Sequence, residues 1–155
     1  MTVATQYDFH GEADVSTPGL CSLAVATTGG ARTDAGLIIR DGLYVDAYRV
    51  EPGERMSAAA LLGFDHRITM VFRFANNRPA EVRDRNLVLM VATVLRCFAE
   101  HPGRGVLLYN GERVTVQRLG ADVEFDSEWE DWAEVAGVVP LVADRPLRRL
   151  GQPLL

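Results

Sequence analysis

The sequence predicts a single α+β domain with a mostly antiparallel sheet, one face of which is covered by a long apolar helix. Two hairpin signals indicate the sheet, because Asp41-Gly42 and Asn110-Gly111 each stand between runs rich in β-branched and aromatic residues. A long amphipathic segment over 79–100 supplies the helix. The chain has 155 residues, 48% of them hydrophobic, which suits one domain with a substantial core.

The first third of the chain predicts a strand, a helix and a hairpin. Apolar and polar residues alternate over 3–9, which is the period of a half-buried strand. Thr17-Pro18 predicts the start of a helix, and a Gly-Gly pair predicts its end. The β-rich runs 37–39 and 43–45 then flank the Asp-Gly turn.

The middle of the chain predicts a short helix, the clearest strand and the longest helix. A serine cap and a glycine stop bound the short helix over 57–63. Residues 68–74 alternate, with one isoleucine, one methionine and two phenylalanines on one face. An Asn-Asn-Arg-Pro break then precedes the helix over 79–100, whose apolar stripe is wide enough to be buried on more than one side.

Three short strands are expected next, over 106–109, 113–118 and 121–125. The Asn-Gly turn joins the first two, and a glycine precedes the third. In the third strand Val123 and Phe125 point inward, so the acids that alternate with them are expected to point outward on the opposite face.

A capping box predicts the last helix. Ser127 with Glu130 three residues later is typical of a helix start, here over 128–136. Three prolines beyond this helix rule out further regular elements. The prediction is therefore a domain over 1–139, followed by an extended arm over 140–155 that is rich in proline, arginine and leucine.

The net charge of −5 arises in the last quarter of the chain. Residues 1–118 hold thirteen acids and thirteen arginines, whereas residues 119–144 hold eight acids and no base. The last eleven residues hold three arginines and no acid. The acidic segment repels phosphate, so nucleic-acid binding is not expected, and it would instead steer a basic partner. A solvated hairpin edge and helix face would give the same pattern without binding anything.

No arrangement of residues predicts catalysis, a metal site or a cofactor. The three histidines are not spaced for zinc, neither cysteine lies in a C-x-x-C pair, and no phosphate-binding glycine motif occurs. Asp65-His66 precedes a strand, where a turn and a surface histidine are expected rather than a general base. Cys21 and Cys97 stand in apolar surroundings, which predicts buried reduced thiols of a cytoplasmic protein. No signal peptide and no membrane span are expected.

Two tryptophans stand within the acidic segment. With a spacing of three residues, Trp129 and Trp132 share a face of the predicted helix, and the simplest use of both is to dock that helix on the sheet. Alternatively, one of them is partly exposed among the acids. An aromatic anchor with a charged rim is the usual composition of a protein–protein hot spot.

The stretch 68–125 has a distinctive order of elements. A strand leads to a long apolar helix, then to Gly105-Val-Leu-Leu-Tyr-Asn-Gly-Glu112, then to Val114-Thr-Val-Gln-Arg118, a short acidic strand and a tryptophan. This order resembles the swarming-inhibition-toxin (Sit-type) immunity proteins, small bacterial cytoplasmic proteins encoded beside polymorphic toxins. The resemblance implies a non-enzymatic inhibitor that binds a cognate toxin, and it implies no catalytic residues.

The charge pattern and the resemblance together predict an interaction through an acidic C-terminal surface. The expected partner is a cognate toxin with a basic site, and no nucleic acid, membrane or cofactor is expected. The predicted contact residues are seven acids and one tryptophan: Asp122, Glu124, Asp126, Glu128, Glu130, Asp131, Glu134 and Trp129.

Two other functions are compatible with the same sequence. One is a scaffold or assembly subunit that docks on a larger complex through residues 140–155. The other is a small-molecule-binding or enzymatic α+β domain with a pocket between the long helix and the sheet. All sixteen basic residues are arginine, which fits a high-GC host of the actinobacterium-like or myxobacterium-like kind.

Overall fold

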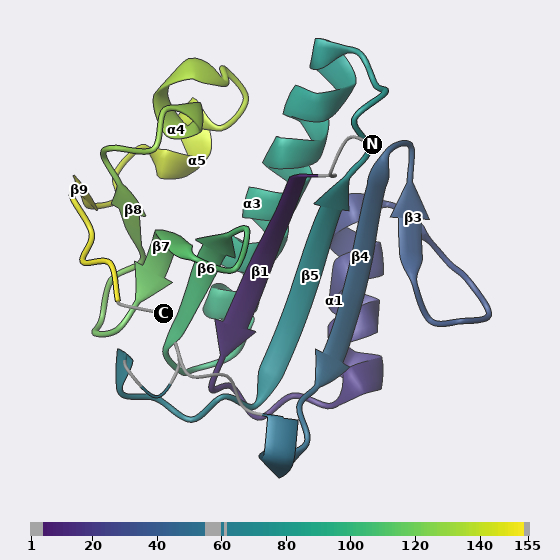
Figure 1. The fold of residues 1–155 in the computed structure, drawn as a ribbon, viewed down its shortest axis with the longest axis horizontal. Coiled ribbons are helices and arrows are strands. Elements are labelled where there is room, and N and C mark those ends of the chain that lie inside the picture. The colour runs from purple at the N-terminus through teal and green to yellow at the C-terminus, as the bar shows by residue number, and fades with distance from the viewer. Residues whose placement is uncertain (1–4, 55–59, 61, 154–155) are drawn as a thin grey trace.

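Nine strands form one sheet in the computed structural model, which describes residues 5–54, 60 and 62–153. The strand order is β2-β3-β4-β5-β1-β6-β7-β8-β9 (Figure 1). The strands are β1 (Thr5–Gly11), β2 (Ala31–Arg32), β3 (Ile38–Arg40), β4 (Leu43–Arg49), β5 (Ile68–Phe74), β6 (Gly105–Tyr109), β7 (Arg113–Arg118), β8 (Glu124–Asp126) and β9 (Leu147–Arg148). Every pairing is antiparallel except that of β8 with β9, so the predicted α+β fold with a mostly antiparallel sheet is confirmed.

Two long helices cover one face of the sheet. They are α1 (Thr17–Thr28) and α3 (Ala80–Glu100), and both lie behind the strands in Figure 1. Inward side chains such as Phe9, Met70 and Phe72 are fully buried together with Met90 of α3. The long helix predicted to cover the sheet is confirmed. No helix in the described part of the chain is long and apolar enough to cross a membrane.

Positive φ angles mark the two predicted hairpin turns. Asp41 and Gly42 have φ of 28° and 83°, and they form the two-residue loop between β3 and β4. Asn110 and Gly111 have φ of 52° and 73° in the turn between β6 and β7. The two hairpin turns that the sequence predicts are therefore confirmed.

A β-bulge interrupts the pairing of β6 with β7. Leu107 pairs with Val116 and Leu108 with Val114, which leaves Thr115 as an extra residue on β7. The Thr115 hydroxyl donates a hydrogen bond of 3.0 Å to the Leu107 carbonyl. The bulge thus keeps its backbone groups satisfied while it redirects the strand.

A second, smaller apolar cluster lies on the sheet face opposite the two helices. Its buried members are Phe64, Val106, Leu108, Val114 and Leu150. The last of these belongs to the arm predicted at the C-terminus. The arm therefore packs on the sheet of its own domain.

The C-terminal region contains more regular structure than the sequence predicts. The helix predicted over 128–136 is a single turn, α4 (Asp131–Glu134), and its N-cap position makes no side-chain hydrogen bond. The prediction of no regular elements beyond it is wrong, because α5 (Val139–Val142) and β9 follow. Proline is compatible with the first turn of α5, where no helical N–H bond is lost.

Some predicted elements cannot be compared with the structure. The short helix predicted over 57–63 lies largely outside the described residues. The remaining short element between β4 and β5 is a 3-10 turn, η1 (Pro52–Glu54).

Candidate functional site

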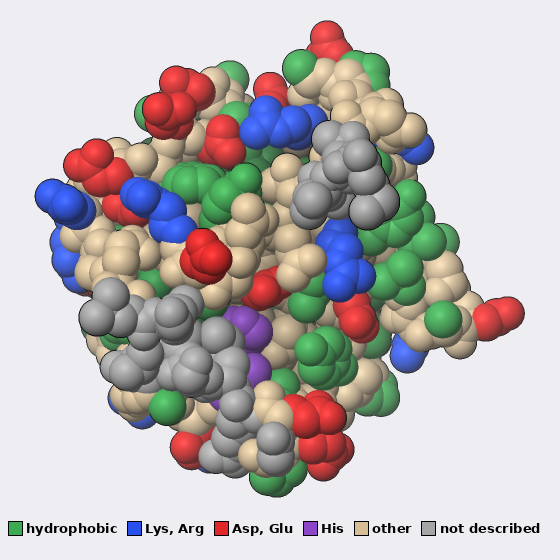
Figure 2. Space-filling model, viewed as in Figure 1, with side chains coloured by type: hydrophobic (Ala, Val, Ile, Leu, Met, Phe, Trp, Pro, Cys, Tyr) green, Lys and Arg blue, Asp and Glu red, His purple; other side chains and the backbone are tan. Residues whose placement is uncertain are grey.

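A cavity of about 320 Å³ opens beside the segment that precedes α4. The ends of β1, β6 and β7 and the amino end of α3 complete its walls. The lining residues are Thr5, Tyr7, Arg83, Tyr109, Arg113, Glu128, Trp129, Glu130 and Asp131. At this corner of the molecule, acidic and arginine side chains surround an apolar patch (Figure 2).

Three aromatic rings form the apolar wall of the cavity. The ring centroids of Tyr109 and Trp129 are 4.8 Å apart, and both side chains are half-buried. Tyr7 is buried beneath them in edge-to-face contact, 5.2 Å from Tyr109 and 6.2 Å from Trp129. The buried indole nitrogen of Trp129 lies near the Tyr7 hydroxyl without hydrogen-bond geometry.

Both arginines of the cavity lie beside carboxylates. Arg113 Nη2 is 2.8 Å from Asp126 Oδ2, and the Arg113 guanidinium also lies 5.4 Å from the centroid of the Trp129 ring. Arg83 Nη2 is 3.7 Å from Asp131 Oδ2. The positive charge that the two arginines bring is therefore largely compensated inside the protein.

The remaining carboxylates of the cavity face solvent. Glu128 and Glu130 are exposed, and within the described part of the chain neither forms an ion pair. Deeper in the cavity, the Tyr7 hydroxyl donates a hydrogen bond of 3.4 Å to Asp131 Oδ2. Burial and this carboxylate raise the pKa of Tyr7, so its phenol stays protonated.

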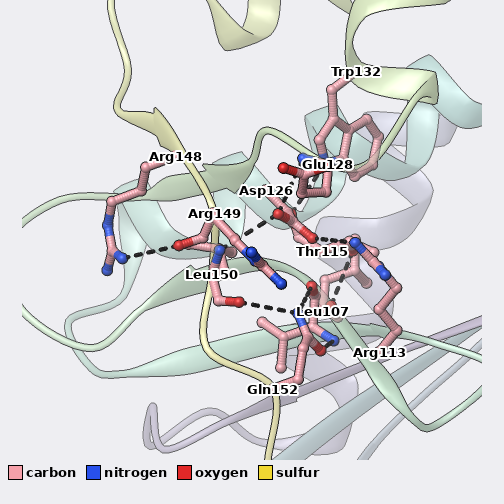
Figure 3. A network of polar contacts seen from close by, with 11 residues as sticks. Leu107, Arg113, Thr115, Asp126, Glu128, Trp132, Arg148, Arg149, Leu150 and Gln152 are labelled. Atoms are coloured by element: carbon pink, nitrogen blue, oxygen red, sulfur yellow. Dashed lines mark hydrogen bonds and ion pairs between the residues drawn. The ribbon is translucent and has the colours of Figure 1, made fainter.

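Asp126 connects the cavity wall to the C-terminal arm (Figure 3). Its side chain is 1% exposed, and Oδ2 accepts the hydrogen bond from Arg113. Oδ1 accepts from the backbone N–H of Glu128 at 3.2 Å and from that of Leu150 at 3.4 Å. One buried carboxylate therefore fixes β7, the segment that precedes α4 and the arm in a single arrangement.

Further polar contacts hold the arm along the sheet edge. Arg148 Nη2 donates to Glu124 Oε1 at 3.0 Å, and this guanidinium lowers the pKa of the Glu124 carboxyl. The Gln152 amide receives the Val114 N–H at 2.7 Å and donates to the Val114 carbonyl at 3.1 Å (Figure 3). Gln152 thus imitates the pairing that another strand would make with β7.

The structure brings half of the predicted contact residues together. Those that line the cavity are Glu128, Trp129, Glu130 and Asp131. Asp122 and Glu134 are also exposed, but they lie outside the lining. The predicted contact surface is thus divided between the cavity and its surroundings.

The predicted outward orientation of Asp126 is wrong. The strand alternation that should expose it ends at β8, and the chain then turns so that this carboxylate is covered and paired with Arg113. Glu124 is half-buried and paired with Arg148. Both acids stabilise the local fold instead of facing solvent.

The two tryptophans have different environments. Trp132 is buried in the main core, and its indole N–H donates to the Thr115 carbonyl at 3.0 Å. Trp129 precedes α4 and stays half-buried in the cavity wall. Trp132 therefore docks its segment on the sheet, as predicted for both tryptophans. Trp129 instead fits the alternative prediction of a partly exposed aromatic side chain among acids.

Five lining residues were not predicted from sequence: Thr5, Tyr7, Arg83, Tyr109 and Arg113. The hairpin register gave a usable signal for two of them, since the Asn-Gly turn places Tyr109 opposite Arg113. Arg83 gave another, because a cation near the amino end of a helix is unfavourable unless an acid lies close. Tyr7 carried no local signal.

A buried polar cluster lies between β1 and β5. His10 Nδ1 is 3.0 Å from His66 Nε2, and the Thr69 hydroxyl lies within 3.1 Å of the first ring and 2.6 Å of the second. Burial and the neighbouring His66 lower the pKa of His10 to about 3. The predicted surface position of His66 is wrong, since it is 5% exposed. The described residues include no group of three potential metal ligands.

A family model described as SitI3-like matches residues 5–136 of the chain. The matched span contains strands β1 to β8, both long helices and α4. It therefore includes every residue that lines the cavity. No curated protein and no solved structure matches the chain significantly.

Proposed function

Because the chain belongs to the SitI3-like family, we propose that it is an immunity-type protein that binds and neutralises a cognate toxin. It acts in the cytoplasm by binding rather than by catalysis, and it needs no cofactor. The proposed contact surface is the acidic rim of the cavity together with α4. The observation that carries this choice is the pair of exposed carboxylates, Glu128 and Glu130, on either side of the half-buried Trp129.

The physical properties of this surface suit an inhibitor. Unpaired carboxylates attract a basic partner over several ångströms, which raises the association rate and disfavours partners of the wrong charge. A half-buried tryptophan supplies the contact area that typically dominates interface energies. The Asp126 carboxylate holds the backbone of Glu128, so less ordering is needed when the partner binds.

Charge reversal tests the proposal without disturbing the fold. Glu128→Lys, Glu130→Lys and Glu134→Lys together change exposed residues that form no ion pair within the described chain. Against the toxin domain encoded by the neighbouring reading frame, this variant should bind at least about tenfold more weakly and should fail to protect cells.

A matched control changes the same number of charges elsewhere. Asp34, Glu51 and Glu54 are exposed acids that do not line the cavity. Their reversal to lysine should leave binding and protection intact. Equal binding by both triple variants would contradict the proposed surface. A neighbouring gene that encodes no toxin would contradict the proposed partner.

The alternative of an assembly subunit places the contact on the arm. Leu150 and Gln152 of the arm are engaged with the domain itself, whereas Leu147 is 52% exposed. Leu147→Asp should therefore leave protection against the toxin unchanged if our proposal is correct. Loss of a larger complex in this variant would favour the assembly function.

A further inference from the structure

We propose that the cavity beside Trp129 receives one arginine or lysine side chain of the partner. This inference rests on the proposed function and deepens it, because it assigns an anchor residue to an interaction so far described only by charge. The cavity, the aromatic wall and the distribution of compensated charges each support it.

The size and the wall of the cavity suit a long side chain with an apolar stem. About 320 Å³ is enough for one such side chain and too little for a folded element. The stem would pack against the half-buried rings of Tyr109 and Trp129. The ring of Trp129 already holds one guanidinium, that of Arg113, at 5.4 Å from its centroid, so this wall is suited to cations.

The charges of the cavity favour a cation over an anion. Arg113 is compensated by Asp126 and Arg83 lies near Asp131, whereas Glu128 and Glu130 form no ion pair in the described part of the chain. An incoming carboxylate or phosphate would approach the two uncompensated glutamates. An incoming guanidinium or ammonium would instead supply the charge they lack.

The deeper carboxylate provides a second contact. Asp131 is only 19% exposed, and it accepts the Tyr7 hydroxyl hydrogen bond while lying 3.7 Å from Arg83. That separation from Arg83 exceeds a hydrogen-bond distance, so the Asp131 carboxylate can accept further donors. A guanidinium in the cavity would reach acceptors both at the floor and at the rim.

The test uses capped arginine as a probe of the free protein. N-acetyl-L-arginine amide is titrated into the ¹⁵N-labelled chain, and the indole N–H signal of Trp129 is followed after assignment through its contacts with the ring protons of Tyr7 and Tyr109. We expect a saturable shift with a Kd on the order of millimolar. Capped lysine should give the same response, whereas capped citrulline, which is isosteric but neutral, should give none.

Variants separate the anchor from general charge attraction. Glu128→Gln with Glu130→Gln should raise the Kd for capped arginine about tenfold, whereas Asp34→Asn with Glu51→Gln should not change it. The proposal is overturned by an unsaturable shift, by an equal response to citrulline, or by unchanged binding in the Glu128/Glu130 variant.

The same probe distinguishes this inference from the proposed function. If the chain binds capped arginine but not the neighbouring toxin, the result supports a cation-binding cavity and refutes the toxin as the partner. Toxin binding that persists unchanged in a Trp129→Leu, Glu130→Gln variant would support the function and refute the anchor.

Discussion

Replacing the half-buried Arg118 with methionine should destabilise the fold more than the same change at an exposed arginine such as Arg145. Its guanidinium donates to three backbone carbonyls at the carboxyl end of α3 and just beyond it: Phe98 at 2.6 Å, His101 at 2.9 Å and Gly103 at 2.8 Å. It also lies 4.6 Å from the centroid of the Phe98 ring. Arg118 therefore closes the carboxyl end of the long helix, where carbonyls have no intrahelical partner.

The cost can be worked from these contacts. Hydrogen bonds from a charged donor contribute about 1.5 kcal/mol or more each when buried, and less here because Arg118 is half-buried and water can replace it in part. Three such bonds and the ring contact give about 2–4 kcal/mol for Arg118→Met. Arg118→Lys keeps the charge but not the planar fork, so we expect about half that loss.

Urea unfolding followed by tryptophan fluorescence measures the difference, since Trp132 is buried. Arg145→Met is the matched control, because among the described residues that exposed side chain makes a single hydrogen bond, to the Leu141 carbonyl. The control should cost less than about 0.5 kcal/mol. The reasoning is refuted if Arg118→Met costs no more than Arg145→Met.

Three further predictions concern buried or strained groups. Because the pKa of His10 is lowered in the folded state, the unfolded chain binds more protons below pH 6.5. The free energy of unfolding should therefore fall by about 2 kcal/mol between pH 7 and pH 5. In urea titrations, His10→Gln should reduce this dependence on pH. Burial raises the pKa of Cys97 to about 11 and also covers Cys21, so Ellman's reagent should titrate neither thiol until the chain unfolds. Gly103 has φ of 138°, and a Cβ there would lie 3.1 Å from the Ala13 nitrogen. Gly103→Ala should therefore lower the free energy of unfolding by about 1–3 kcal/mol, as measured by urea titration.

Local patterns were sufficient to predict most of the sheet. The Asn110-Gly111 turn and the alternation over 68–74 both depend on neighbours a few residues apart, and the structure confirms both elements. The resemblance of 68–125 to Sit-type immunity proteins is likewise confirmed by the family match. The turn and the alternation are each encoded within a few neighbouring residues, so a single sequence is enough to find them.

The C-terminal region could not be predicted in the same way because tertiary contacts override its local signals. Ser127 and Glu130 satisfy the pattern of a capping box, yet the Asp126 carboxylate takes the Glu128 N–H and Trp132 is drawn toward the bulge at Thr115. The chain therefore forms only the single turn α4 in place of the longer helix that the capping box predicts. No periodicity in the sequence reports a contact of that kind.

The position of the arginines also changes the meaning of the acidic segment. Three of its eight acids face arginines that the sequence places in other segments, namely Arg83 for Asp131, Arg113 for Asp126 and Arg148 for Glu124. These ion pairs link α3, β7 and β9 to the acidic segment and so fix the walls around Trp129. The carboxylates left without such partners are fewer than the linear count suggests, but they stand on a fixed framework. Because this framework is already ordered, binding of a partner costs less conformational entropy. A few carboxylates in fixed positions beside an aromatic side chain therefore suit tight inhibition better than a larger mobile patch would.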